Sequence, residues 1–161
     1  MKIVAFTGPS NAGKTTLIES LVTLLVPGKK VVVVKHDPGD KASFDTRGKD
    51  SWRFFTSGAD TLVVSPSKTA YFSHEPWDLD RIIRVVGHCD YLFIEGLRSW
   101  PVPRIAVFRE SVDVDYLSLV RAVVVDEKLL SNIGEIDLPV FPFTRTQEIL
   151  QWIEHNAMER N

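Results

Sequence analysis

Short apolar runs alternate with longer stretches of helical spacing along this chain. In the helical stretches, apolar residues recur every three or four positions, as at Leu79, Ile82, Ile83 and Val86. Several of the short runs are rich in β-branched residues on both faces, which is typical of parallel strands covered on both sides. The expected strands are 2–7, 30–34, 61–65, 91–94, 105–108, 122–125 and 140–143, and the expected helices open at 16 and cover 77–86 and 145–158. This alternation predicts an α/β fold with three layers and a mainly parallel sheet.

The stretch from 35 to 49 interrupts this alternation. It is polar and has no apolar period, so we expect a functional or mobile loop. After it, Asp50 or Ser51 is expected to cap a short helix that Gly58 closes. Residues 68–72 are expected to extend the sheet beyond a turn at Pro66.

Composition narrows the classes of protein. A length of 161 residues fits one domain, 1–161. The net charge of −2 gives no bulk attraction to nucleic acid or to an anionic membrane. A single cysteine, Cys89, cannot form an intramolecular disulfide and fits a reducing compartment. Since no apolar run approaches a membrane span and the N-terminal residues do not form a secretory signal, we expect a cytoplasmic protein.

The strongest chemical motif lies between the first strand and the first helix. Residues 8–15 read Gly-Pro-Ser-Asn-Ala-Gly-Lys-Thr, a complete GxxxxGK[ST] phosphate-binding loop. Backbone N–H groups of such a loop and of the helix N-terminus face phosphate oxygens. Lys14 is expected to reach the β- and γ-phosphates, and the Thr15 hydroxyl to bind Mg²⁺. The nucleotide-binding residues are therefore expected to be Gly8, Ser10, Asn11, Ala12, Gly13, Lys14, Thr15 and Thr16.

Ligands of parallel α/β sheets bind at the carboxyl ends of the strands, so the residues there are the next candidates. Glu95 ends the strand 91–94 and is expected to be the acidic partner of Thr15 at Mg²⁺; the alternative is a solvated carboxylate. Asp90 stands at the opposite end of this strand and should point away. Lys35 and His36 end the second strand, where a switch-like loop would meet the γ-phosphate or the attacking water.

Other residues carry weaker signals. His36 and Asp45 are candidate catalytic groups, although a structural hydrogen-bonding role explains His36 nearly as well. The charged groups of Lys41, Arg47, Lys49 and Asp50 fit a solvated loop as well as they fit a site for a second anionic ligand. Asp126 could contact a guanine base, but an N-cap role is favoured. Trp52, Phe54 and Phe55 could form an aromatic stripe for a base, with core packing favoured. Cys89 is expected to be a packed side chain, and no role is assigned to His74, His88 or His155.

These motifs together resemble one family. The phosphate loop, the Lys35-His36 strand end, the run 44–52 followed by Ser57-Gly58-Ala59, and Ile94-Glu95-Gly96 with Arg98 beyond it resemble molybdopterin-guanine dinucleotide biosynthesis protein B (MobB), from residue 1 to about 126. The resemblance implies a GTP-binding protein of the signal-recognition-like branch of P-loop NTPases. It further implies at most a weak Mg²⁺-dependent GTPase, a homodimer, and assistance to the nucleotidyltransferase MobA, which attaches GMP to molybdopterin.

The resemblance also assigns residues. Gly8, Gly13, Lys14, Thr15 and Thr16 would hold the phosphates and Mg²⁺, and Glu95 would be the second acidic contact. The candidate second-ligand or switch residues are Lys35, His36, Asp45, Lys49, Asp50 and Arg98. One departure is that residues 37–40, Asp-Pro-Gly-Asp, stand where the family tends to carry further histidines. Direct binding of molybdopterin by the loop 35–49 stays open.

An alternative function uses the same loop. A small-molecule kinase would prefer ATP and use Asp37 or Asp45 as the base for a substrate hydroxyl. Such kinases carry a mobile, arginine-rich lid. Arg81 and Arg84 lie at helical spacing on one face, which a solvated helix explains more simply.

Overall fold

The computed structural model describes residues 1–160, which form two compact units. The first unit comprises residues 1–36 together with the chain from Val86 onward, and the second comprises 37–85. Each is described by itself below. Within the described residues, no helix combines the length and the apolar content needed to cross a membrane.

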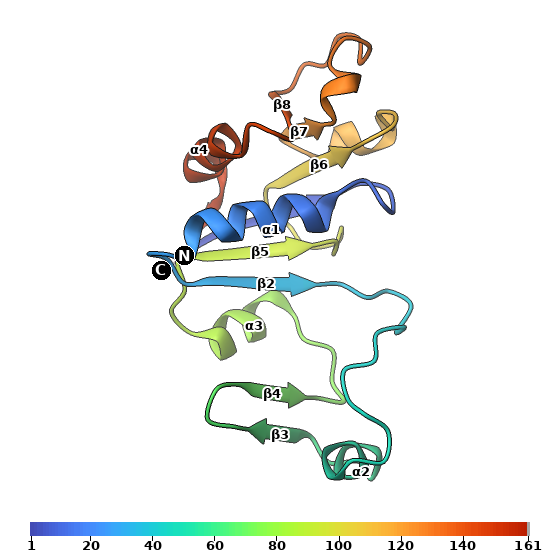
Figure 1. The fold of residues 1–161 in the computed structure, drawn as a ribbon, viewed down its shortest axis with the longest axis vertical. Coiled ribbons are helices and arrows are strands. Elements are labelled where there is room, and N and C mark those ends of the chain that lie inside the picture. Colours follow the sequence, from blue (N-terminus) through green and yellow to red (C-terminus); the bar gives the residue numbers. More distant parts are fainter. Residues whose placement is uncertain (161) are drawn as a thin grey trace. The chain divides into compact units, whose positions relative to one another are not determined.

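The first unit is built on a seven-stranded sheet. Its order is β2-β5-β1-β6-β7-β8, all parallel, with β9 pairing antiparallel with the start of β1. Figure 1 shows β2, β5, β6 and β7 with their arrowheads pointing the same way. The strands are β1 Lys2–Thr7, β2 Val31–Lys35, β5 Tyr91–Glu95, β6 Arg104–Phe108, β7 Ala122–Val125, β8 Val140–Pro142 and β9 Met158–Glu159. The predicted α/β fold with a mainly parallel sheet is confirmed.

Two helices cover one face of this sheet. They are α1, Lys14–Leu25, and α4, Thr146–Asn156. Leu17 and Leu21 of α1 and Ile149 and Ile153 of α4 are buried in one cluster with alternate residues of the central strands. The spacing of these positions, three or four residues apart, is the apolar stripe that predicted both helices.

The opposite face is covered over β6 and β7 by the chain that follows them. A short 3₁₀ helix, η1 Val114–Leu119, places Tyr116 edge-on to Phe108 at a centroid distance of 5.8 Å. Val123 and Val125 of β7 complete this second cluster. Central strands are thus buried on both faces, as their continuous apolar runs predicted.

The second strand differs from its prediction. The run 30–34 predicts a strand covered on both sides, but β2 is the edge of the sheet and Val33 is 44% exposed. An edge position follows from strand order, which depends on partners distant in sequence. A run of valines therefore indicates a strand but not its place in the sheet.

The second unit contains α2 Asp50–Thr56, a two-stranded antiparallel sheet of β3 Thr61–Val64 and β4 Thr69–Phe72, and all of α3 (Leu79–Val86) except its last residue. The prediction that 68–72 extends the main sheet is wrong, because β4 pairs only with β3. Lys49, not Asp50 or Ser51, occupies the N-cap of α2, and it makes no side-chain cap. Gly58 closes the helix as predicted, with a positive φ of 100°.

Candidate functional site

The phosphate loop joins β1 to α1 at the carboxyl edge of the first unit's sheet. Gly8 and Gly13 have φ of 140° and 93°, values that residues with a side chain rarely adopt. A Cβ on Gly8 would lie 2.2 Å from the carbonyl oxygen of Val107 in β6. The two glycines therefore let the loop lie against β6 and turn into the N-terminus of α1, where free N–H groups attract anions.

Lys14 lies within this loop. Its Nζ donates to the carbonyl oxygens of Gly8 at 3.0 Å and Pro9 at 2.6 Å. Burial lowers the pKa of Lys14; Glu95 opposes this shift, and the cations Lys35 and Arg98 add to it. A phosphate anion would offset both the burial and the neighbouring positive charge.

Thr15, Lys35 and Glu95 meet beside the loop, from three different elements. The Thr15 hydroxyl donates to the Glu95 carboxylate, with oxygen–oxygen distances of 3.3 and 3.4 Å. Lys35 Nζ lies 2.9 Å from Glu95 Oε1, and the Glu95 side chain is only 12% exposed. A hydroxyl and a carboxylate are ligands that Mg²⁺ prefers, so these two residues could hold the ion at the phosphates.

A cavity of about 580 Å³ opens over these groups. It contains eight residues of the loop and strand ends and one that the sequence analysis missed, Arg109. Arg109 follows β6, and its Nη2 lies 3.3 Å from where a Cβ on Gly13 would be. The lining residues are Ser10, Asn11, Gly13, Lys14, Thr15, Thr16, Lys35, Glu95 and Arg109. The only signal that could have found Arg109 is its position at the carboxyl end of a strand.

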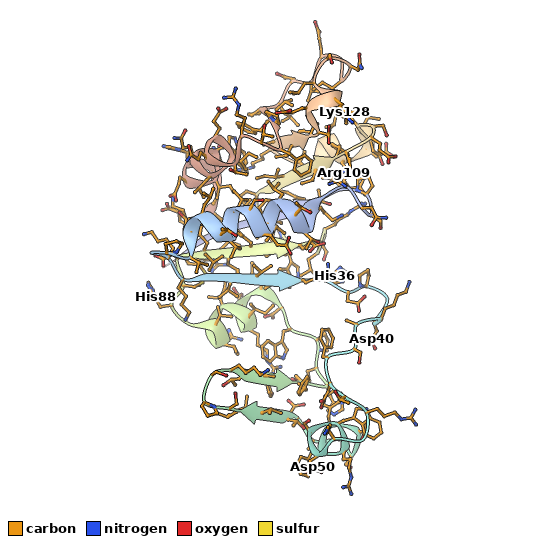
Figure 2. All side chains as sticks on the ribbon, viewed as in Figure 1. His36, Asp40, Asp50, His88, Arg109 and Lys128 are labelled. Atoms are coloured by element: carbon orange, nitrogen blue, oxygen red, sulfur yellow. The ribbon has the colours of Figure 1, made fainter. Side chains whose placement is uncertain are left out.

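Figure 2 shows His36 and Arg109 at the carboxyl ends of their strands, β2 and β6. His36 packs beside Gly96, where a Cβ would be 3.1 Å from the His36 Cβ. The His36 backbone N–H donates to the carbonyl oxygen of Glu95 at 3.0 Å. His36 therefore flanks the Glu95 strand end, while His88 is labelled at the opposite edge of the sheet.

Arg104 holds the loop that follows Glu95 in place, a role that the sequence analysis also missed. This buried guanidinium donates to four backbone carbonyls, those of Gly96, Leu97, Arg98 and Trp100, at 2.9–3.4 Å. Burial lowers the pKa of Arg104. Arg98, held by this loop, donates to the Tyr116 hydroxyl and places its guanidinium 4.1 Å from that ring.

The remaining second-ligand or switch candidates, Asp45, Lys49 and Asp50, belong to the second unit. Asp37 also lies there and accepts the backbone N–H of Ala42 at 2.6 Å, which lowers its pKa. The Asp37 carboxylate therefore stabilises a turn of its own loop.

Several weaker sequence predictions can now be resolved. Asp126 accepts the N–H of Lys128 at 3.1 Å and is the N-cap of a 3₁₀ helix, η2 Glu127–Leu129, as favoured. Cys89 is buried, and Asp90 accepts the N–H of Lys30 at 2.8 Å at the far end of β5. Core packing of the aromatic stripe is wrong, because α2 has no buried residue: Phe54 is 60% exposed, and Trp52 and Phe55 are half-buried. Among residues 1–160, no group of three or more His, Cys, Asp or Glu side chains is arranged to hold a metal ion.

Comparison with known proteins identifies relatives over most of the chain. Residues 3–126 match the family described as molybdopterin guanine dinucleotide synthesis protein B. A putative molybdopterin-guanine dinucleotide biosynthesis adapter protein of Methanocaldococcus jannaschii is 30% identical over 79% of this chain, which spans only 56% of that relative. A probable adapter protein of Bacillus subtilis is 30% identical, covering 86% of this chain and 84% of the relative. The crystal structure of Bacillus subtilis MobB matches with a TM-score of 0.77 at 27% identity, covering 94% of this chain and 97% of that one.

Proposed function

The chain belongs to the MobB family, and from this premise we propose that it is a GTP-binding adapter in the assembly of molybdopterin guanine dinucleotide. The observation that carries the proposal is the cavity in which the phosphate loop, Thr15, Lys35 and Glu95 converge. A complete phosphate loop beside a carboxylate suits a nucleoside triphosphate with Mg²⁺. The guanine base is proposed from the family alone.

Within this proposal each residue has a distinct task. The backbone N–H groups of Gly8 and of residues 10–15 and the Lys14 ammonium would bind the phosphates, while Thr15 and Glu95 would hold Mg²⁺. The ion, when bound, neutralises charge on the β- and γ-phosphates. Arg109 lies where it can add a second cation to the phosphates. His36 is a candidate for orienting water.

Hydrolysis is proposed to be slow. Efficient P-loop GTPases place a glutamine to orient the attacking water, and an arginine stabilises the transition state. Here the residues after Glu95 are Gly96, Leu97 and Arg98, without a glutamine. Slow hydrolysis suits an adapter that keeps its nucleotide bound while it assists a MobA-like guanylyltransferase.

Titration calorimetry with GTP and ATP, each with Mg²⁺, tests the proposal. GTP binding at least tenfold tighter than ATP binding, or about 1.4 kcal/mol, is expected. Lys14→Ala should abolish GTP binding, while Lys29→Ala, an exposed lysine outside the loop, should leave it unchanged. Micromolar GTP affinity in the Lys14 variant would refute this site. A preference for ATP would instead favour the small-molecule kinase.

We also propose that the protein is a homodimer. The β3–β4 sheet has only two strands, so the outer edge of each strand pairs with no further strand of this sheet. Its apolar side chains are exposed: Leu62 is 60% and Val64 is 70% exposed. Exposed apolar strands with free edges tend to pair with a strand of another chain. In a two-fold symmetric dimer, the same surface of a second copy would cover them.

A further inference from the structure

The second unit contains a cavity that the proposed nucleotide site does not use. It has a volume of about 1060 Å³, and the residues that line it all lie between Asp40 and Pro76. Aromatic rings from α2 and from β4 and the chain after it face it, among them Trp52, Phe55, Tyr71 and His74. Aromatic rings offer stacking surfaces to a flat organic ligand, and the polar side chains among the lining residues can fix its orientation.

The ring arrangement is fixed by polar contacts at its edge. Phe55 and His74 stack in parallel, with centroids 4.0 Å apart and an interplanar angle of 5°. Asp60 accepts hydrogen bonds from the Tyr71 hydroxyl at 2.7 Å and from the His74 backbone N–H at 3.0 Å. The rings are therefore held in place before any ligand arrives, which lowers the entropic cost of binding.

One carboxylate in this cavity is incompletely paired. Asp45 lines the cavity, and its Oδ1 accepts the Thr46 backbone N–H at 2.7 Å. Its Oδ2 is buried and has no hydrogen-bond partner among residues 1–160. Buried polar atoms are nearly always hydrogen-bonded, because an unpaired one costs free energy. A ligand N–H would supply the missing donor.

Arg47 adds a positive charge at the same place. Its guanidinium lies over the Trp52 ring, 5.9 Å from the centroid. The cavity therefore combines stacking surfaces, carboxylates that can accept from N–H groups (Asp40, Asp45 and Glu75) and a cation next to a lining ring. This set suits a flat heterocycle with several N–H donors.

We propose that this cavity binds a bicyclic heterocycle through its 2-amino-4-oxopyrimidine edge. The ring N–H and the amino group of that edge donate to the Asp45 carboxylate, and the rings stack on the aromatic lining. Pterins and guanine share this edge. The inference deepens the proposed function and rests on it for the choice of these two ligands, since molybdopterin and guanine are the parts of the dinucleotide that the family is named for.

The test titrates the full chain with 6-hydroxymethylpterin, with guanosine and with lumazine, which has a carbonyl in place of the 2-amino group. The wild type is expected to bind 6-hydroxymethylpterin at least tenfold more tightly than lumazine, whose carbonyl would face the carboxylate. Asp45→Asn, whose amide can donate to that carbonyl, should weaken pterin binding at least tenfold and reverse the preference. Asp80→Asn, an exposed carboxylate of the same unit that does not line the cavity, is the matched control and should change neither.

These titrations distinguish a pterin site from a guanine site. They also distinguish a failure of this inference from a failure of the proposed nucleotide site. Binding of 6-hydroxymethylpterin but not guanosine identifies a pterin site, and the reverse identifies a second guanine site. No binding of either ligand, or equal affinity in Asp45→Asn, would overturn the inference while leaving GTP binding at the phosphate loop intact. Conversely, Lys14→Ala should lose GTP and keep the pterin, so failure of the nucleotide site is distinguishable.

Discussion

At the scale of single residues, the phosphate loop depends on what Gly8 lacks. Its φ of 140° is strained for any side chain, and an added Cβ would overlap the Val107 carbonyl oxygen. Gly28, by contrast, has no positive φ, and a Cβ there would meet nothing within 4 Å. A side chain is therefore expected to be tolerated at Gly28 but not at Gly8.

Gly8→Ala is expected to lower the free energy of unfolding by roughly 2–4 kcal/mol, because backbone strain and overpacking add. Urea unfolding followed by circular dichroism measures this change. Gly28→Ala is the control and should be neutral or slightly stabilising. Equal stabilities of the two variants would show that the loop does not lie against β6 as described.

Arg109 is the residue-scale feature that the sequence analysis missed. It is exposed, yet it lines the nucleotide cavity beside Gly13. Arg109→Ala should weaken GTP binding about tenfold, or about 1.4 kcal/mol, because a charge-assisted contact to phosphate is lost. Calorimetry checks this, with Arg121→Ala, an exposed arginine outside that cavity, as the control. An unchanged affinity in Arg109→Ala would remove Arg109 from the site.

At the scale of elements, the second unit depends on one carboxylate. Asp60 immediately precedes β3 and accepts hydrogen bonds from Tyr71 in β4 and from Ser73 and His74 beyond it. The hydrogen bond from Tyr71, followed by that from the His74 backbone, holds the pKa of Asp60 below its ordinary value of 3.8. A depressed pKa means that the ionised form stabilises the folded state.

Stabilisation by Asp60 should therefore be fully present above about pH 4 and be lost as the pH falls through its lowered folded pKa. Hydrogen exchange of the β3–β4 amides between pH 6 and pH 3 measures it. In Asp60→Asn the protection factors of these amides, which are exchange rates relative to the intrinsic rate at the same pH, should be lower at pH 6. They should also change less between pH 6 and pH 3 than in the wild type. Asp50→Asn, in α2 of the same unit, should retain the wild-type profile.

At the scale of the whole molecule, the proposed dimer follows from the exposed hairpin. Val64→Lys places a charge on its apolar surface and should shift the protein to the monomer in light scattering. Val26→Lys is the control, because Val26 is 58% exposed at the C-cap of α1 in the first unit and belongs to no strand. A dimer that survives Val64→Lys would exclude this surface as the interface.

The sequence alone determined the features that depend on residues close together in the chain. The phosphate loop is contiguous, and the apolar periods of α1, α4 and the buried strands are local, so both could be predicted. The end of each strand also indicated where Lys35, His36 and Glu95 would lie, because parallel strands place their carboxyl ends at one edge.

Only the tertiary structure decided the features that depend on pairing between distant segments. Residues 69–72 resemble the other strands in sequence, but their backbone hydrogen bonds go to β3 and not to the main sheet. Three further features are likewise nonlocal: the edge position of β2, the place of Arg109 beside Gly13, and the cavity that Asp45, Phe55 and His74 line together. No local period encodes such contacts, because the free energy that selects them comes from the folded chain as a whole.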